Sequence, residues 1–530
     1  MFAHPAYTPS TMFCVFWVAL IAPLVSGVAV TIPLSVSGDA PGVTGNLVSL
    51  SIEQDRWLDW VGNTSRNSFF FNTLDNLVAL TGSDPTIRIG ADSEDHTQFS
   101  AAVQFVQQVF PPPTATVPYP EATNIVAGPG FYQAAKFLPS GTGVTWGVNF
   151  GGKNLTATFL ETRAIITAFA SPALKNAGIT LDFLELGNEA DLYKNNGLRA
   201  STYSISQYTA EWITFATNMT RTANLAGSNT RIWGAAFADS SHSSTGFSPQ
   251  GIFANNILSS EPGGFINTIS QHHYSGSFCS GNGGLLQDLM TKATIRSNLS
   301  SFTPDIQATQ DRNLDYVFGE TNSYSCHGAP GVSNTAGAAL WTLDYALFAS
   351  QLGISKVFFH EGIGYKYNLI QPAVLTRSIL NGSPLATPQQ PHVQPQYYAA
   401  IIAAEAIGNS GQTQAVELSI SNTRISGYAF YEGGALKRAV FINSLAFLAG
   451  ATNRTSTHLD LTFSGSGTKP KSFSVKRLVI KHADDASGLT WGGQTYETAD
   501  ARVGGTPSSE TGTVAGGIDI PATQAIMISF

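Results

Sequence analysis

Eight short apolar runs, rich in β-branched and aromatic residues, alternate with longer helix-like stretches between residues 47 and 360. Such alternation favours parallel strands joined by crossover helices, and eight units are what a closed (β/α)8 barrel requires. The sequence therefore predicts an α/β fold, a (β/α)8 TIM barrel, over residues 47–385. The runs cover residues 47–53, 86–90, 144–150, 181–187, 231–236, 268–274, 316–320 and 356–360, and the clearest helical stretches cover 157–176, 204–226 and 334–352.

The pattern changes behind a proline-rich connection near residue 385. Beyond it, short segments of alternating polarity, such as residues 425–431 and 473–480, are separated by turns rich in Gly, Ser and Thr. Alternation with a period of two predicts strands with one buried face. We therefore expect residues 386–530 to form a C-terminal all-β sandwich domain, joined by the strand-like N-terminal residues 29–46.

An apolar stretch over residues 12–25, followed by small residues, is typical of a secretory signal peptide, which we place at residues 1–28. It is short for a membrane span and Pro23 interrupts it, so no membrane association is expected after its removal. A signal anchor is the alternative. Six Asn-x-Ser/Thr triplets agree with a secreted, extracellular glycoprotein. Because Pro384 follows the triplet at Asn381, the predicted glycosylation sites are Asn63, Asn154, Asn218, Asn298 and Asn453.

The composition argues against some classes of partner. Charged residues make up only 12% of the chain, the net charge is −8 and no basic run occurs. Nucleic acid is therefore not an expected partner, because phosphate binding needs clustered Lys and Arg. The His and Cys residues form no compact ligand pattern, so no metal site and no cofactor are predicted. The sequence leaves the oligomeric state open.

The residues that end the predicted strands are the candidates for chemistry, because barrel active sites lie at that end. The fourth run ends in Asn188 and Glu189, and the seventh ends in Glu320. Two carboxyl groups across a barrel mouth suit glycoside cleavage, since one protonates the leaving oxygen while the other attacks the anomeric carbon.

Other residues near these strand ends have competing interpretations. Glu361, at the end of the eighth run, is a rival site carboxylate, whereas Glu185 is more simply a paired carboxylate inside the barrel. His272 and His273 end the sixth run, either as site residues or as core histidines.

Residues 186–190 (LGNEA), 319–357 and 474–496 carry a family resemblance. They resemble glycoside hydrolase family 79, most of all its fungal β-glucuronidase-like members, with heparanase more distant. The resemblance covers most of the chain behind the signal. It implies a retaining β-glucuronidase that acts on a carbohydrate, a glycan bearing glucuronic acid or 4-O-methylglucuronic acid.

The resemblance also implies roles for individual residues. Glu189 would be the acid/base, Glu320 the nucleophile and Asn188 the partner of the sugar 2-hydroxyl. The remaining predicted substrate-binding positions are Glu53 and Asp92 for the other hydroxyls, and Tyr274 and Tyr367 near the uronate.

The chain departs from the family behind the nucleophile, where a tyrosine and a glycine-rich turn usually hold the carboxylate through backbone N–H groups. Here residues 323–328 are SYSCHG, and only Gly328 is kept as a predicted substrate contact. His327 either supplies positive charge to a uronate or is exposed. The alternatives are therefore a retaining β-glycosidase for a neutral sugar and a secreted carbohydrate-binding protein without catalysis.

Two cysteines remain once Cys14 leaves with the signal. Cys279 follows the sixth run and Cys326 the seventh, so neighbouring loops on one barrel face bring them within bonding reach. We predict a Cys279–Cys326 disulfide; the alternative is two separate buried thiols.

Overall fold

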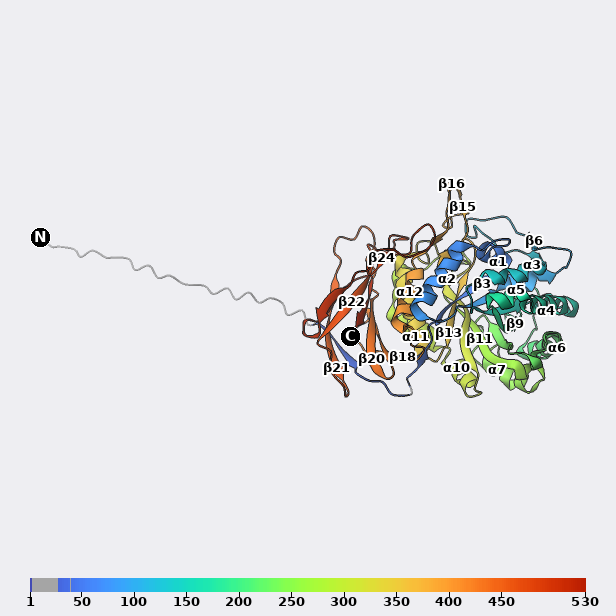
Figure 1. Cartoon of the computed structure of the whole chain (residues 1–530), viewed down its shortest axis with the longest axis horizontal. Coiled ribbons are helices and arrows are strands. Elements are labelled where there is room, and N and C mark those ends of the chain that lie inside the picture. The colour runs from blue at the N-terminus through green and yellow to red at the C-terminus, as the bar shows by residue number, and fades with distance from the viewer. Residues whose placement is uncertain (2–26, 39) are drawn as a thin grey trace.

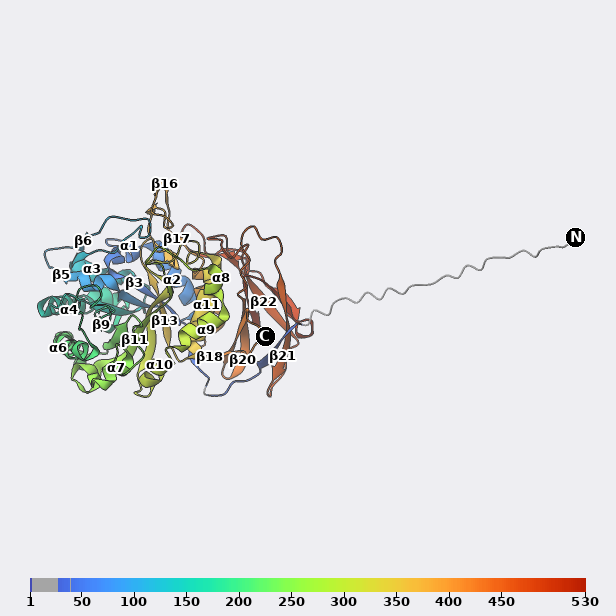
Figure 2. The ribbon, with the colours of Figure 1, turned by 180° about the vertical axis from the view of Figure 1, so that it is seen from behind.

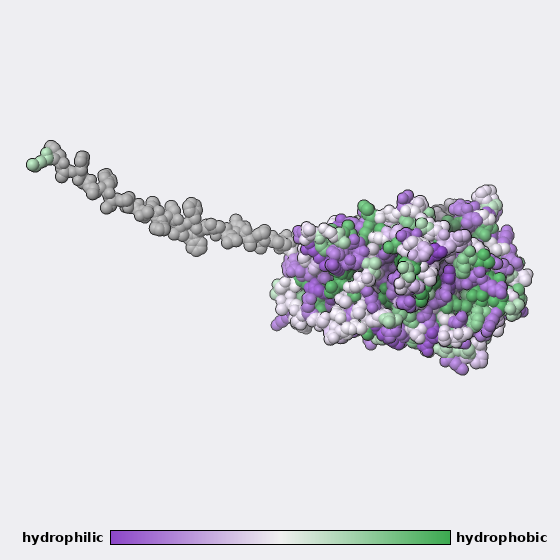
Figure 3. Space-filling view, turned by 90° about the horizontal axis from the view of Figure 1, so that it is seen from above, coloured by the Kyte–Doolittle hydropathy of each residue, from purple (hydrophilic) through white to green (hydrophobic). Residues whose placement is uncertain are grey.

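The computed structural model describes residue 1, residues 27–38 and residues 40–530. Most of the predicted signal peptide therefore lies outside the described residues. No helix in the described part of the chain combines the length and the apolar character that crossing a bilayer requires. Hydrophilic and hydrophobic residues alternate in small patches over the face seen in Figure 3.

Eight parallel strands close into a barrel in chain order, so the predicted TIM barrel is confirmed (Figure 1). Strand β13 pairs with β3 and closes the ring. Most barrel positions are buried on both faces, as expected for parallel strands covered by helices. The strands are β3 (Val48–Glu53), β4 (Thr86–Gly90), β8 (Gly143–Val148), β9 (Thr180–Leu186), β10 (Arg231–Phe237), β11 (Ile266–Ser277), β12 (Asp315–Ser325) and β13 (Lys356–Glu361).

The helices form where a capping side chain is followed by apolar residues at helical spacing. Ser204 and Gln207 make a reciprocal capping box at the start of α6, and the Asn154 side chain caps α4. The helices are α1 (Trp57–Val61), α2 (Ser68–Thr81), α3 (Pro129–Gln133), α4 (Leu155–Phe169), α5 (Pro172–Ala177), α6 (Ile205–Ala223), α7 (Pro249–Ala254), α8 (Leu286–Met290), α9 (Lys292–Ser300), α10 (Thr303–Gln310), α11 (Ala336–Gln351) and α12 (Tyr397–Ile407).

One predicted helix is wrong in detail. Residues 157–176 do not form a single helix, because α4 ends at Phe169 and α5 begins at Pro172. The Ser171 side chain caps the N–H of Leu174, and proline has no N–H with which to continue a preceding helix. The Ser-Pro pair therefore starts a new helix.

Two facing sheets form the C-terminal region, which confirms the predicted β-sandwich. Apolar side chains from both sheets, among them Ile32, Phe441, Leu461 and Ile528, form their common core. The smaller sheet contains β1 (Val28–Pro33), β21 (Ser456–Ser464) and β27 (Ile518–Pro521). The larger contains β2 (Gly42–Val43), β18 (Thr413–Glu417), β19 (Ile425–Glu432), β20 (Ala435–Asn443), β28 (Gln524–Ser529), β22 (Ser472–Val479), β23 (Thr490–Trp491), β24 (Gln494–Thr495), β25 (Gly504–Gly505) and β26 (Glu510–Thr513).

The larger sheet also packs against the barrel. Along β19, Tyr428 and Phe430 belong to the barrel-side core, whereas Ala429 and Tyr431 belong to the core between the sheets. Successive strand residues point to opposite faces, so both faces of this sheet are covered. Helix α11 is buried over nearly its whole length between the barrel strands and the sandwich (Figure 2).

The remaining short strands lie in loops around the barrel, and the β15–β16 hairpin projects from one end of it (Figure 1). They are β5 (Thr97–Phe99), β6 (Val106–Val109), β7 (Asn124–Ala127), β14 (Ile370–Gln371), β15 (Leu375–Arg377), β16 (Pro384–Gln389) and β17 (His392–Val393). Helix α12 packs on α2 and α11 of the barrel before the sandwich strands resume at β18. The domain boundary at residues 385/386 stays a prediction, and this helix favours a later one.

Candidate active site

A cavity of about 730 Å³ lies at the C-terminal ends of the barrel strands. Most of the predicted site residues line it, although they come from strands distributed around the whole barrel. Those in its wall are Glu53, Asp92, Asn188, Glu189, Tyr274, Glu320 and Tyr367.

Glu320, near the middle of β12, is held by two donors. Its Oε2 accepts from Nη1 of Arg88 at 2.7 Å, and its Oε1 accepts from the Tyr274 hydroxyl at 2.7 Å. Burial opposes ionisation, but the charges of His360 and Arg88 and the Tyr274 hydrogen bond hold the pKa of Glu320 well below its usual value. This carboxyl group is therefore an ionised carboxylate.

Glu189 reaches the cavity because the chain turns sharply behind β9. Gly187 has φ +78°, and a Cβ there would lie 2.6 Å from Cβ of Phe150. Glu189 itself has φ +49°, and its N–H donates to the Ala236 carbonyl at 2.9 Å. The turn aims the Glu189 side chain towards Nδ1 of His272, which lies 3.0 Å from its Oε1.

The pKa of Glu189 moves in the opposite direction to that of Glu320. Burial raises the pKa of Glu189 well above its usual value, and the negative charge of Glu320 raises it further. Burial also lowers the pKa of His272 to about 4, so its imidazole is neutral at neutral pH. Glu189 is therefore the group that holds a proton.

The two carboxyl groups lie close together across the cavity. One ligand atom from each of Glu189, His272 and Glu320 lies within 4.8 Å of the others. Among the described residues, this is the one group compact enough to hold a metal ion. However, Arg88 and Tyr274 already occupy the carboxylate of Glu320, so the site fits a cation poorly.

Arg88 forms the floor of the site, and it was not among the residues predicted from the sequence. It is fully buried between Ile87 and Ile89 of β4, and its guanidinium also bonds Glu185 and Oδ1 of Asn188, the latter at 2.8 Å. Glu185 is therefore the paired interior carboxylate that its position predicted. An arginine inside an apolar strand was the available signal, because a buried guanidinium needs carboxylate partners.

The predicted hydroxyl-binding residues differ in exposure. Glu53 is buried, accepts from the Ser93 N–H at 2.8 Å and lies 3.2 Å from Nε2 of His360. Burial acts against the charged form of His360, but Glu320 and Glu53 raise its pKa to about 8. Asp92 has a side chain that is 60% exposed at the edge of the cavity.

The loop behind β12 differs from the prediction at one residue. Gly328 does not line the cavity, and its N–H donates to the Tyr324 carbonyl at 3.0 Å, so it is not available to substrate. His327 does line the cavity and is only 5% exposed. The alternative that His327 is simply exposed to solvent is therefore wrong. Glu121, on a loop near β7, pairs with His327, and no sequence pattern indicated this contact.

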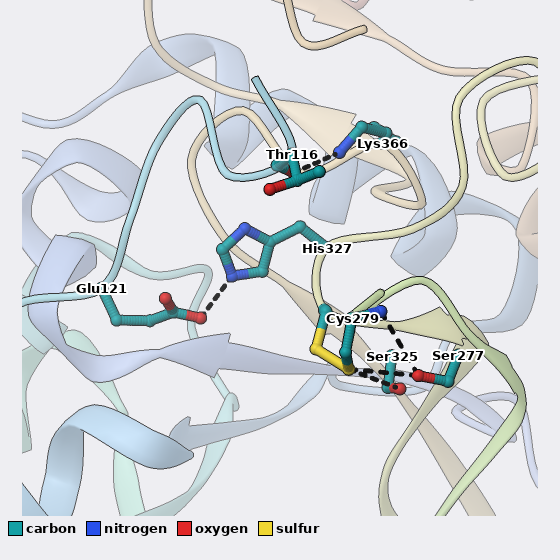
Figure 4. Close-up of a disulfide and its surroundings, with 8 residues drawn as sticks. Thr116, Glu121, Ser277, Cys279, Ser325, His327 and Lys366 are labelled. Atoms are coloured by element: carbon teal, nitrogen blue, oxygen red, sulfur yellow. Dashed lines mark hydrogen bonds and ion pairs between the residues drawn. A yellow bond between two sulfur atoms is a disulfide. The ribbon is translucent and has the colours of Figure 1, made fainter. Parts of the chain in front are cut away.

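The predicted disulfide is present: Cys279 and Cys326 are bonded, and both line the cavity (Figure 4). Glu361, the rival carboxylate, lies outside the cavity wall and accepts the N–H groups of Leu369 and Ile370. His273 lies in the wall with its Nδ1 3.3 Å from Asp239.

The predicted glycosylation sites differ in accessibility. Asn63, Asn154 and Asn453 are exposed, whereas Asn218 and Asn298 are half-buried within α6 and α9. Modification at these five positions stays a prediction.

Comparisons with known proteins find similarity to a glycoside hydrolase domain and to fungal β-glucuronidases. Residues 427–527 match the glycosyl hydrolase family 79 C-terminal beta domain. A β-glucuronidase of Neurospora crassa is 29% identical over 518 residues, which cover 88% of this chain and 87% of that protein. A β-glucuronidase of Aspergillus niger is 28% identical over 495 residues, covering 89% and 86%.

Solved structures support the fold. A 4-O-α-L-rhamnosyl-β-D-glucuronidase from Fusarium oxysporum, solved as a Rha-GlcA complex, superposes with a TM-score of 0.77 at 23% identity, covering 95% of this chain and 100% of that one. A family 51 arabinofuranosidase from Xanthomonas axonopodis superposes with a TM-score of 0.60 at 13% identity, covering 95% and 99%. The predicted resemblance to glycoside hydrolase family 79 is thereby confirmed by the family's C-terminal domain over residues 427–527, and the similarity to fungal β-glucuronidases extends over most of the chain.

Proposed function

We propose that this protein is a retaining glycoside hydrolase that removes β-linked glucuronic acid, or its 4-O-methyl form, from glycans. Both fungal relatives named above are β-glucuronidases, and each aligns with more than four-fifths of this chain. The observation that carries the proposal is the carboxyl pair: one oxygen of Glu189 and one of Glu320 lie within 4.8 Å. A short separation of this kind, about 5–5.5 Å between the carboxyl groups, belongs to retaining enzymes, since inverting enzymes leave room for a water molecule.

The chemistry follows from the opposite pKa shifts. Glu320, ionised, attacks the anomeric carbon, while Glu189, protonated, gives its proton to the leaving oxygen. A water molecule then enters, Glu189 removes its proton, and the glycosyl–Glu320 ester is hydrolysed with a second inversion at carbon 1.

Neighbouring side chains position the reaction. Arg88 holds Oδ1 of Asn188, which leaves the amide NH₂ to donate to the sugar 2-hydroxyl. Tyr274 keeps Oε1 of Glu320 oriented. Glu53, Asp92 and Tyr367 line the same cavity as contacts for the rest of the sugar.

The proposal extends to location: this is a secreted, extracellular glycoprotein. The apolar stretch at residues 12–25 and the Asn-x-Ser/Thr triplets support it. Expression in a fungal host tests it, with secretion of a glycosylated, shortened chain as the expected result and retention of the intact chain in cells as the contrary one.

A second candidate is a β-glycosidase for a neutral sugar, and one observation favours it. Six carboxyl groups line the cavity, and within the described part of the chain no lysine or arginine does. An anionic sugar must therefore find a particular positive or hydrogen-bonding partner to bind there.

The test is a panel of 4-nitrophenyl β-glycosides: glucuronide, 4-O-methylglucuronide, glucoside, galactoside and xyloside. We expect the two glucuronides to be cleaved with the highest kcat/KM and the first-formed sugar to be the β-anomer by NMR. Faster cleavage of a neutral glycoside would favour the second candidate. An α-anomer formed first would exclude double displacement, and glycan binding without any hydrolysis would make the protein a lectin-like one.

A further inference from the structure

The acidic cavity poses a problem for uronate binding that one side chain resolves. Six carboxyl groups line it, from residues 53, 92, 121, 189, 239 and 320, and the ionised ones among them, such as Glu121 and Glu320, repel an anion. Arg88 beneath them is fully engaged by carboxylate and amide partners. Four histidines remain in the wall: His272, His273, His327 and His360. A carboxylate-binding group has to come from these imidazoles, from hydroxyl groups or from backbone N–H groups.

Contacts distinguish these histidines. His360 has both nitrogens near partners, the Ser51 carbonyl at 3.1 Å and Glu53 at 3.2 Å. His272 lies between the two central carboxyl groups, where the anomeric centre reacts. His273 is packed among Phe302, Phe318 and Tyr345.

His327 resembles His272 and His273 in having one ring nitrogen without a partner, but it lies on the loop behind β12, whereas they lie within β11. Its Nε2 bonds Oε1 of Glu121, while its Nδ1 is buried and has no hydrogen-bond partner among the described residues. The imidazole stacks on the Tyr365 ring, with centroids 3.8 Å apart and planes 9° apart. The Tyr365 hydroxyl in turn donates to Glu121 at 2.9 Å.

The backbone around His327 is also constrained. Cys326, His327 and Gly328 have φ of +58°, +69° and +85°, a left-handed run that non-glycine residues seldom adopt. The disulfide ties Cys326 to Cys279 on the neighbouring loop, and Figure 4 shows His327 beside this bond with its ring directed to Glu121. Such positive φ values concentrate at ligand sites, where the surroundings hold them.

Groups of both signs lie near His327: the Glu121 carboxylate and the Lys366 ammonium. Burial raises the pKa of Glu121, but the positive charge and hydrogen bond of His327 outweigh it and lower the value to about 2, so Glu121 is a carboxylate that pairs with the imidazole. Lys366, whose N–H donates to the His327 carbonyl, is buried, and its ammonium donates to the Thr116 carbonyl at 3.2 Å. Burial lowers the pKa of Lys366 to about 8, which leaves it charged at neutral pH.

We propose that His327 recognises the carboxylate of the sugar, donating from Nδ1 while Glu121 and Tyr365 hold the ring and Lys366 supplies positive potential behind it. His327 thereby takes over the task that the Gly328 N–H, bonded to the Tyr324 carbonyl, does not perform. This inference rests on the proposed function, because it assigns the group that makes the same site select a uronate over a neutral hexose.

The test compares kcat/KM for 4-nitrophenyl β-D-glucuronide and 4-nitrophenyl β-D-glucoside, which differ at carbon 6. We expect His327→Leu to lower kcat/KM on the glucuronide about 10- to 100-fold, as loss of a hydrogen bond to a charged group does, and to leave the glucoside nearly unchanged. His327→Asn, whose amide can donate from near the Nδ1 position, should retain part of the selectivity. Lys366→Met should give a smaller loss confined to the glucuronide.

Ser325→Ala is the matched control, because Ser325 lines the same wall two residues before His327; both substrates should be unaffected. Equal losses on both substrates in His327→Leu would assign a structural role and overturn the inference, as would an unchanged glucuronide rate. Failure of the proposed function would instead be seen in the wild-type protein, as faster cleavage of the glucoside.

Discussion

At the scale of single residues, two chemically identical side chains acquire opposite protonation states from their neighbours. Glu320 faces a guanidinium and a phenol hydroxyl, whereas Glu189 faces Glu320 and a neutral imidazole. The ionised group and the protonated group are thus assigned by contacts within a few ångströms.

The pH dependence of the reaction follows from this asymmetry. Glu320 must be ionised and its pKa is depressed, so kcat/KM should persist into moderate acid. Glu189 must be protonated and its pKa is raised, so kcat/KM should fall as the pH rises through that value. In Glu189→Gln, measured with a 2,4-dinitrophenyl glucuronide, this alkaline limb should be absent. Its survival at the same pH would assign the limb to another group.

Removing the acid/base should separate substrates by leaving group. Glu189→Ala should lower kcat/KM about 10²–10⁴-fold for a poor leaving group such as an alkyl alcohol, because general-acid assistance is lost. An activated aryl glucuronide should form the glycosyl–enzyme normally and then stall. Azide should restore turnover and yield the β-glycosyl azide, which NMR identifies; uniform loss without rescue would contradict the role of Glu189.

Some site residues are visible in the sequence and others are not. Glu189 and Glu320 end predicted strands, and barrel geometry alone brings strand ends together. His327 and Glu121, in contrast, are 206 positions apart and belong to loops whose paths no local pattern determines. Arg88 lies inside β4, whereas Glu185 belongs to β9 and Glu320 to β12, so only closure of the barrel brings them to its guanidinium.

At the scale of elements, two strands extend beyond the barrel. β11 has 12 residues and β12 has 11, whereas the other barrel strands have five to seven. They remain paired as far as Ser277 and Ser325, just before the disulfide. This paired extension forms one side of the cavity and supports the His327 loop.

The disulfide should therefore matter for stability and for binding. Replacing both cysteines with serine should lower the free energy of unfolding by about 2–4 kcal/mol, because the bridge closes a loop of 47 residues. The KM for a glucuronide should rise while kcat changes little. Urea unfolding and steady-state kinetics measure these effects. Equal stability in the variant would mean that the extension holds its shape unaided.

Element types were easier to predict than their boundaries. All eight barrel strands lie where apolar runs predicted them, because buried parallel strands require such runs. The break between α4 and α5 depended on the cap at Ser171, which competes with helix continuation. The packing of α12 against α2 and α11 is a tertiary contact. Because α12 follows a proline-rich connection, the sequence did not indicate that it packs on the barrel.

At the scale of the whole molecule, the sandwich is attached to the barrel by a buried polar cluster as well as apolar packing. Arg296 of α9 bonds both oxygens of Asp344 on α11, at 2.6 and 2.9 Å. It also bonds Glu417 of β18 at 2.7 Å and the Tyr428 hydroxyl of β19 at 2.6 Å. One guanidinium thus joins two barrel helices to two sandwich strands.

This attachment predicts cooperative unfolding. Calorimetry should show one transition for barrel and sandwich together, because both faces of the larger sheet are buried. Arg296→Ala should lower the free energy of unfolding by about 3–5 kcal/mol, because it leaves the partly buried carboxylates of Asp344 and Glu417 without their charged partner. Arg221→Ala, at an exposed ion pair with Glu261, is the matched control and should have little effect. Two separate transitions in the wild-type protein would contradict the coupling.

The central claim is that Glu320 forms a covalent bond to the sugar, and trapping tests it most directly. The protein is incubated with 2-deoxy-2-fluoro-β-D-glucuronosyl fluoride, which slows hydrolysis of the glycosyl–enzyme more than its formation, and its peptides are then analysed by mass spectrometry. We predict one added fluoroglucuronosyl group, on Glu320 in the peptide that contains residues 319–323. A label on another carboxylate, such as Glu361, or turnover of the reagent without any labelled protein, would contradict the account.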